Sequence, residues 1–267
     1  MFKKQTGGSV VCPSCRNLVG VNDEQCFNCG RRNPGMWGYA KIFQQLGYDL
    51  GFLPFVLYGS VLMFILTLLW DPAGIRSGGM MMVSPSPESL LTFGASGTIA
   101  VFELGHWWSV LSASFLHGGV IHIFFNMMWA RNLLPVTGEV YGVSRCVIIY
   151  TVASIVGFWA STYIGGSGLT IGASASIFGL FGALIQSGGS IGNQLKIWAG
   201  VLFVLGLIMP GVDNFAHAGG FVGGYLAGRF MDPTKPATQV YLFIAMGCIF
   251  AFVASIILSF VSIRLRF

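Results

Sequence analysis

Seven long apolar segments constrain this chain more than any other feature of its sequence. Each is close to the roughly 20 residues that an α-helix needs to cross the hydrocarbon core of a bilayer. They fall at about 52–70, 119–137, 144–164, 171–188, 195–210, 214–231 and 238–262. Only 9% of the 267 residues are charged, against roughly 25% in a soluble domain. We therefore predict an all-α polytopic membrane protein with seven spans.

The basic residues predict the orientation of these spans. If the N-terminus is cytosolic, eleven Lys and Arg residues fall on the cytosolic side and three on the outer side. The eleven are Lys3, Lys4, Arg16, Arg31, Arg32, Lys41, Arg131, Arg145, Lys196, Arg229 and Lys235, and the three are Arg76, Arg264 and Arg266. This bias is the usual one for cytosolic loops of membrane proteins. The formal net charge of +5 then reflects topology and contact with anionic lipid, and it does not indicate a nucleic-acid partner.

Four cysteines before the first span form two C-x-x-C pairs and resemble a zinc ribbon. They are Cys12, Cys15, Cys26 and Cys29. Four thiolates at this spacing can close a tetrahedral Zn²⁺ site, and so short a segment needs such a crosslink to fold. Two disulfides or a redox pair are the alternatives, but the cytosolic side is reducing and a Cys₄ site keeps no open position for chemistry. We place a structural or partner-binding ribbon at 1–35 and a membrane-surface linker at 36–51.

Several polar side chains lie close to the outer ends of predicted spans. With the N-terminus inside, the second, fourth and sixth spans all run inward from the outer face. His122, Ser174 and His217 each lie about three residues into one of these spans, and Asn126 is one turn beyond His122 on the same face. Polar groups in hydrocarbon are costly without partners, so these residues are candidates for function.

The fourth and sixth spans also carry stripes of residues suited to close packing. The stripes are Ser174, Phe178 and Gly182 on the fourth span, and His217, Gly220 and Gly224 on the sixth. Glycines allow a neighbouring backbone to approach closely. Packing one stripe on the other brings the His217 imidazole towards the Ser174 hydroxyl, with the Phe178 ring for the imidazole to lie on. The alternative is ordinary glycine packing that happens to bury a serine and a histidine.

With these motifs, the chain from about 52 to 262 resembles the rhomboid intramembrane serine proteases, with a six-helix core and one added C-terminal helix. The family motif G-x-S-G corresponds to Gly172-Ala173-Ser174-Ala175, and A-H-x-x-G-x-x-x-G corresponds to Ala216 through Gly224. The motif H-x-x-x-x-H-x-x-x-N is present as His117, His122 and Asn126. The resemblance implies a serine endopeptidase that hydrolyses peptide bonds in or near transmembrane segments of other proteins.

The resemblance also implies a role for each of these residues. Ser174 would attack the substrate carbonyl while His217 takes its proton, in a dyad without the usual carboxylate. The Ser174 backbone N–H, His122 and Asn126 would hold the oxyanion, and His117 would support the adjacent loop or the water supply. No cofactor is expected for catalysis. The expected partners are transmembrane substrates, the bilayer, and a protein bound by the ribbon.

Three positions depart from the family pattern. Ala175 replaces a glycine and adds a methyl where the fourth and sixth spans should be closest, Ser109 stands where arginine is frequent, and Phe178 replaces a common tyrosine. None of these changes removes a reacting group. Ser176 is a second candidate nucleophile, but it points about 200° around the helix from Ser174 and away from His217.

Glu139, Met80–Met82 and the function of the whole chain each have an alternative interpretation. Glu139 is either a carboxylate that anchors helix ends or a solvated charge, and Met80–Met82 form either a lip that touches substrate or lipid, or a mobile loop. A catalytically weak or inactive rhomboid-like protein that binds membrane clients would usually lack the serine or the histidine, and both are here. A transporter or channel would carry repeats or charges along a path, for which only Arg131 is a candidate.

Overall fold

The computed structural model describes residues 4–13, 15, 17–40, 50–77, 82–235 and 238–265. Some features discussed above lie outside these ranges, namely Lys3, Arg16, Lys41, Met80, Met81, Arg266 and most of the predicted linker. The described chain is mostly helical, with two short two-stranded sheets. The all-α class is therefore confirmed.

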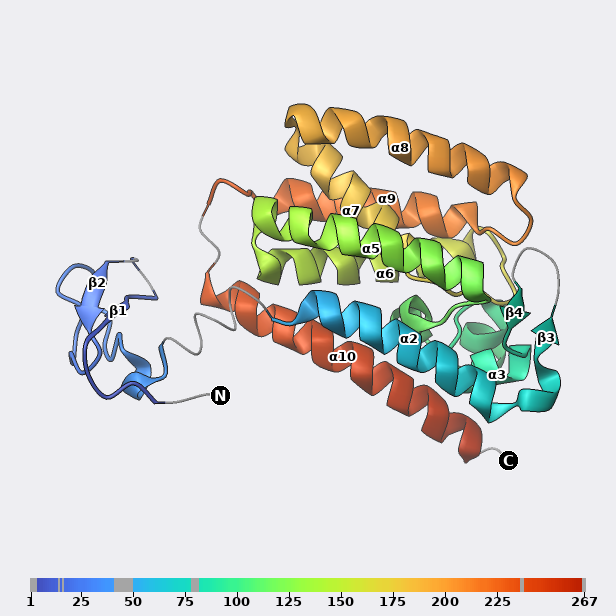
Figure 1. The fold of residues 1–267 in the computed structure, drawn as a ribbon, viewed down its shortest axis with the longest axis horizontal. Coiled ribbons are helices and arrows are strands. Elements are labelled where there is room, and N and C mark those ends of the chain that lie inside the picture. The colour runs from blue at the N-terminus through green and yellow to red at the C-terminus, as the bar shows by residue number, and fades with distance from the viewer. Residues whose placement is uncertain are drawn as a thin grey trace.

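Seven long helices correspond to the seven predicted apolar segments (Figure 1). They are α2 (Phe52–Trp70), α5 (Val120–Tyr141), α6 (Val143–Tyr163), α7 (Ser174–Ser187), α8 (Gly189–Ile208), α9 (Asn214–Phe230) and α10 (Gln239–Arg264). Two starts differ from the prediction, and the fifth helix begins at Gly189, six residues before the predicted 195. The fourth helix begins at Ser174 itself, because Gly172 adopts a φ of 121°, which is incompatible with a helix.

The helices make this a multi-pass membrane protein. By length and composition, α2, α6, α8 and α10 can each cross a membrane alone. Residues Ser109–Phe115 and α5 form a fifth candidate span, which is bent by 97°. The remaining two helices are shorter, with 14 residues in α7 and 17 in α9. The number of seven crossings therefore stays a prediction.

The central helix α7 packs against α5, α6, α8 and α9, and its contact with α9 is the most extensive. Glycine makes this contact possible. A Cβ atom at Gly220 would lie 2.0 Å from the Ala175 carbonyl oxygen, and one at Gly224 would lie 2.0 Å from the Gly179 carbonyl oxygen. On α9 the contact follows the predicted stripe, whereas on α7 it runs through Ala175 and Gly179, beside the predicted stripe. This contact fixes α9 relative to the start of α7.

Short elements connect α2 to α5 at one end of the helices. They are η2 (Pro72–Gly74), β3 (Arg76–Ser77), β4 (Val83–Ser84), α3 (Pro87–Thr92), η3 (Ile99–Glu103), α4 (Ser109–Ser112) and η4 (Ala113–Phe115). The C-terminal helix α10 holds this segment through polar contacts. Trp108 Nε1 donates to Ser259 Oγ at 3.0 Å, and His106 Nε2 is 2.9 Å from Ser262 Oγ.

The cysteine segment folds separately at the other end, near the start of α10 (Figure 1). It contains β1 (Ser9–Val11), β2 (Leu18–Gly20) and η1 (Met36–Gly38), with β1 and β2 antiparallel. Its small core extends to Ala40, which is 1% exposed. The Arg31 side chain links it to the helices by donating to the Gln239 side chain at 3.0 Å.

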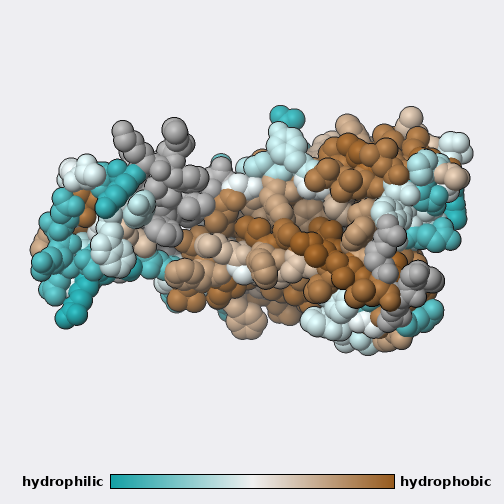
Figure 2. All heavy atoms as spheres, turned by 90° about the horizontal axis from the view of Figure 1, so that it is seen from below, coloured by the Kyte–Doolittle hydropathy of each residue, from teal (hydrophilic) through white to brown (hydrophobic). Residues whose placement is uncertain are grey.

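The surface agrees with insertion in a bilayer. Figure 2 shows hydrophobic side chains over the middle of the helical part, with hydrophilic residues at the ribbon and at the opposite end. Of the four helices that can cross a membrane alone, α8 is the least covered by the rest of the protein, since only 11% of its apolar stretch is buried.

Candidate active site

Ser174 stands at the first position of α7, directly after a tightly constrained turn. The Gly172 backbone N–H donates to the Ala113 carbonyl at 2.9 Å, which ties the turn to η4. A Cβ atom at Gly172 would come within 2.7 Å of His122 Nε2. Only glycine therefore fits here, both for its positive φ and for the space, and the turn sets Ser174 beside His122.

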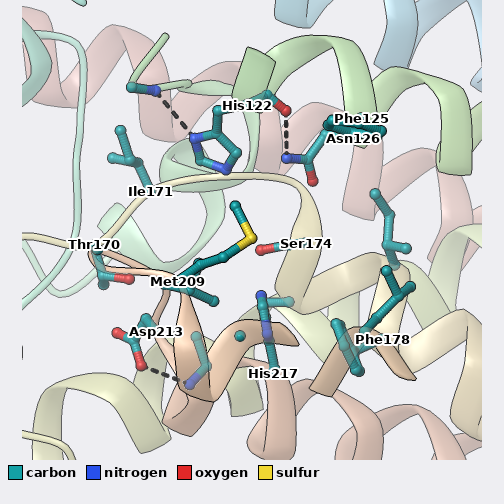
Figure 3. Close-up of a pocket in the computed structure, with 18 of the residues that line it drawn as sticks. His122, Phe125, Asn126, Thr170, Ile171, Ser174, Phe178, Met209, Asp213 and His217 are labelled. Atoms are coloured by element: carbon teal, nitrogen blue, oxygen red, sulfur yellow. Dashed lines mark hydrogen bonds between the residues drawn. The ribbon is translucent and has the colours of Figure 1, made fainter. Parts of the chain in front are cut away.

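His217 lies in the first turn of α9 and stacks on Phe178 of α7. The two ring centroids are 4.3 Å apart and the planes differ by 14°. The imidazole is 7% exposed. In Figure 3 its edge and the Ser174 hydroxyl face each other across a cavity. The structure thus brings together the two polar residues that the sequence placed on separate spans.

His122 and Asn126 of α5 line the other side of this cavity (Figure 3). The Gly118 backbone N–H donates to His122 Nδ1 at 3.2 Å, so a neutral His122 carries its hydrogen on Nε2. The Asn126 side-chain nitrogen donates to the His122 carbonyl at 2.8 Å, which leaves its second N–H for another acceptor. Both side chains can therefore offer a donor to a group bound at Ser174.

The cavity has a volume of about 380 Å³ and is lined mainly by apolar side chains from α5, α7, α8 and α9. His117 is fully buried behind it, with its ring centroid 5.1 Å from that of His122. Ser176 is fully buried too, and the cavity lining within the described chain does not include it. Of the two serines, Ser174 is the one that reaches the cavity.

The structure shows which neighbours surround the residues that depart from the family pattern. The Ala175 methyl does not lie in the closest α7–α9 contact, as the sequence suggested, since only the Ala175 backbone meets Gly220 there. The methyl points to α6, where a Cβ atom at Gly157 would lie 2.8 Å from it. Ser109 is fully buried and its hydroxyl donates to Ser96 at 3.1 Å. Glu139 is exposed in the last turn of α5.

Asp213 is a cavity residue that the sequence reasoning missed. It precedes α9 and caps it, with Oδ1 accepting a hydrogen bond from the Ala216 backbone N–H at 3.0 Å. Its position three residues before Ala216 is the N-cap signal that could have drawn attention to it. The side chains that it also contacts, Ser161 and Ser167, are too distant in the sequence to be inferred as partners.

The four ribbon cysteines converge on one point that fits a zinc ion. Their sulfur atoms all lie within 4.8 Å of one another. The Cys12–Cys29 and Cys15–Cys26 sulfur pairs are 3.8 and 3.6 Å apart. Tetrahedral thiolates at about 2.3 Å from a zinc ion would be separated by about 3.8 Å, whereas a disulfide needs about 2.05 Å. The geometry suits a Cys₄ metal site and does not suit two disulfides.

The fold and the cavity define a multi-pass helical membrane protein in which a serine and a histidine on two packed helices face each other. Residues 104–234 match the sequence model of the Rhomboid domain. This part of the chain, about half of its length, is a Rhomboid domain.

Curated relatives agree with this assignment. RHOMBOID-like protein 4 of Arabidopsis thaliana is 31% identical over 156 residues, which are 55% of this chain and 40% of that protein. Rhomboid protease GluP of Bacillus subtilis (strain 168) is 31% identical over 160 residues, which are 57% of this chain and 31% of that protein. RHOMBOID-like protein 7 of Arabidopsis thaliana is 27% identical over 202 residues, 66% of this chain and 64% of that protein. The chain thus spans between 31% and 64% of the length of these relatives.

Proposed function

We propose that this chain is an intramembrane serine endopeptidase that cleaves peptide bonds in or near transmembrane segments of membrane proteins. One observation carries the proposal: Ser174, His217, His122 and Asn126, from three helices, line a single cavity within the membrane domain. A relative named as a rhomboid protease adds support. The expected orientation has the ribbon in the cytosol and the cavity open to the outer face.

In the proposed reaction, the Ser174 oxygen attacks the substrate carbonyl carbon and its proton passes to His217. The Phe178 ring, stacked on the imidazole, keeps His217 in the plane needed for this transfer. The charge that develops on the carbonyl oxygen is held by the Ser174 backbone N–H and the side chains of His122 and Asn126. His217 then returns the proton to the leaving amine, and water releases the acyl group.

Ser174→Ala and His217→Ala are each expected to abolish cleavage of a single-pass test substrate, because each removes a reacting group. Cleavage by the purified protein in detergent or in vesicles is the measurement, with insertion and thermal stability checked in parallel. Labelling by a fluorophosphonate should require both residues.

Ser176→Ala is the matched control, since Ser176 lies in the same turn but outside the cavity lining. It should label and cleave like the wild type. If Ser176→Ala lost activity and Ser174→Ala kept it, the nucleophile would be assigned wrongly. A wild-type protein that binds membrane segments but neither labels nor cleaves would favour the client-binding alternative.

We also propose that the ribbon binds a structural zinc ion through Cys12, Cys15, Cys26 and Cys29. Their mutual distances and the all-thiol donor set support zinc over a harder metal. A closed Cys₄ site holds a fold together and supplies no open position for a substrate. The ribbon is then a docking element for a protein partner, separate from the cavity.

A further inference from the structure

Asp213 lies where the elements that carry the proposed serine and histidine meet. It is four residues before His217, about one helical turn away on the same face, and both residues line the cavity (Figure 3). Its Oδ1 accepts a hydrogen bond from the Ala216 backbone N–H at 3.0 Å, so the carboxylate is fixed at the N-terminus of α9. The side chain therefore moves with the helix that bears His217.

The second oxygen of the carboxylate binds the chain that leads to Ser174. Oδ2 accepts hydrogen bonds from the hydroxyl of Ser161, near the end of α6, and from that of Ser167 at 2.8 Å, in the loop between α6 and α7. The Thr170 hydroxyl, four residues before Ser174, also hydrogen-bonds to Asp213. One carboxylate thus ties the loop that ends at Ser174 to the first turn of α9.

The surroundings keep this carboxylate charged. Burial alone would raise the pKa of Asp213, but hydrogen bonds from Ser161, Ala216, Ser167 and Thr170 outweigh burial and hold the pKa below its ordinary value. Asp213 is therefore ionised at neutral pH. Among the described residues, the ionisable groups that act on His217 are Asp213, from the start of its own helix, and His122, from α5.

We propose that Asp213 is a positioning residue for the hydrolysis proposed above. It holds the Ser174 loop against α9, and its negative charge stabilises the imidazolium that forms when His217 takes the Ser174 proton. Asp213 stays ionised throughout and exchanges no proton. The proton moves from the Ser174 oxygen to His217 as the bond to the substrate carbonyl carbon forms. The inference rests on the proposed function and adds an acidic group to the dyad.

Asp213→Asn in the full-length protein tests the role of the charge. Asparagine caps a helix about as well as aspartate, so α9 should keep its start. We expect kcat to fall by up to about 10²-fold, the cost of a misplaced reacting pair, with little change in KM. The acidic limb of the pH profile of kcat/KM should move to lower pH, because the base loses a charge that favours its protonation.

Two further variants separate charge from structure. Asp232→Asn makes the same substitution beyond the other end of α9 and should change neither kcat nor the pH profile. The Ser161→Ala, Ser167→Ala double variant keeps the carboxylate and the cap but removes two donors. It should lower kcat less than Asp213→Asn and leave the acidic limb in place. This variant also keeps the inference testable if Asp213→Asn fails to fold.

Wild-type kcat and an unmoved acidic limb in a folded Asp213→Asn protein would overturn the inference. So would a lower kcat with an unmoved limb, since that pattern describes a structural role alone. If Asp213→Asn does not fold, wild-type kcat in the double serine variant would also overturn it. Ser174→Ala, assayed in parallel, reports on the proposed function separately: cleavage that survives this change contradicts the dyad itself, whatever Asp213 does.

Discussion

His122 and Asn126 of α5 are held in orientations that suit the oxyanion role proposed for them. The bond from Gly118 to His122 Nδ1 fixes the side of the ring that carries hydrogen. The bond from Asn126 to the His122 carbonyl fixes the orientation of the amide. Both donors are therefore oriented before any substrate arrives, which is the condition under which such groups stabilise a transition state.

His122→Ala and Asn126→Ala are each expected to slow cleavage without abolishing it. Removal of one oxyanion donor typically costs on the order of 10²–10³ in rate, but donors that share a charge partly replace one another. The loss should appear in kcat more than in substrate binding, which steady-state kinetics with a purified substrate can separate.

Asn132→Ala is the matched control for the asparagine. Asn132 lies on the same helix and donates to the Met128 carbonyl at 2.9 Å, four residues earlier, as Asn126 does to His122, but it is exposed. Its replacement should leave kcat unchanged. Unchanged kcat in His122→Ala, in Asn126→Ala and in the double variant would remove both side chains from the mechanism.

At the residue scale, the sequence predicted the side chains whose local motif is distinctive and missed those defined by distant partners. Ser174 and His217 could be paired because both helices carry a stripe of recognisable spacing. Asp213 could not, because its hydroxyl partners Ser167 and Ser161 lie 46 and 52 residues away, one in the loop between α6 and α7 and the other near the end of α6. The direction of the Ala175 methyl was also beyond the sequence, since it depends on which neighbouring helix offers a glycine.

At the element scale, the backbone contact between α7 and α9 sets the relative position of Ser174 and His217, the proposed dyad. Gly220→Ala and Gly224→Ala should each force these helices apart, because the new Cβ atom would lie 2.0 Å from a backbone oxygen of α7. We expect lower thermal stability and a loss of cleavage in both variants. Thermal unfolding in detergent and the cleavage assay check the two effects.

Gly247→Ala provides the comparison within a helix. A Cβ atom at Gly247 of α10 would meet nothing within 4 Å, and alanine is favoured over glycine in a helix by about 1 kcal/mol. This variant should match or exceed the wild type in stability and keep full activity. Equal behaviour of Gly220→Ala and Gly247→Ala would contradict the role given to the contact.

The helices themselves were the most predictable elements. Continuous apolar segments mark α2, α6 and α10 because lipid-facing and core-facing sides are both hydrophobic. The segment between α2 and α5 gave no such signal. Its short elements are held by tertiary contacts, such as Trp108 with Ser259 of α10, and have no hydrophobic period of their own.

At the scale of the whole molecule, the cysteine ribbon lies near the start of α10 (Figure 1). Ser174 and His217 stand instead at the starts of α7 and α9, and the chain reaches α10 only after the far end of α9. We expect the double variant Cys12→Ser, Cys15→Ser to lose bound zinc and to keep cleavage of a simple substrate in detergent. The physical reason is distance, because the hydrogen bond from Arg31 to Gln239 joins the ribbon to the start of α10 and not to the helix ends that carry Ser174 and His217. Metal content by atomic emission and the cleavage assay are the two measurements.

Cys248→Ser is the control for cysteine loss, since Cys248 lies in α10 far from the ribbon sulfurs. It should keep both zinc and activity. Loss of cleavage by the purified protein on removal of the metal, without unfolding of the helical part, would show that ribbon and cavity are coupled. Loss of client selection in cells with intact cleavage in detergent would agree with a docking role.

The length of α7 sets how far Ser174 lies from the turn that joins α7 to α8. Helices α7 and α8 share the turn at Gly188, but the 14 residues of α7 rise about 21 Å and the 20 residues of α8 about 30 Å. Measured from that turn, Ser174 is thus about 9 Å less far along α7 than Ile208 is along α8, whose length nearly matches the bilayer core. A membrane segment offering its bond at that level carries about six helical residues above the bond. Under the proposed function, the ease of melting those turns would select substrates more strongly than any short sequence read at the surface.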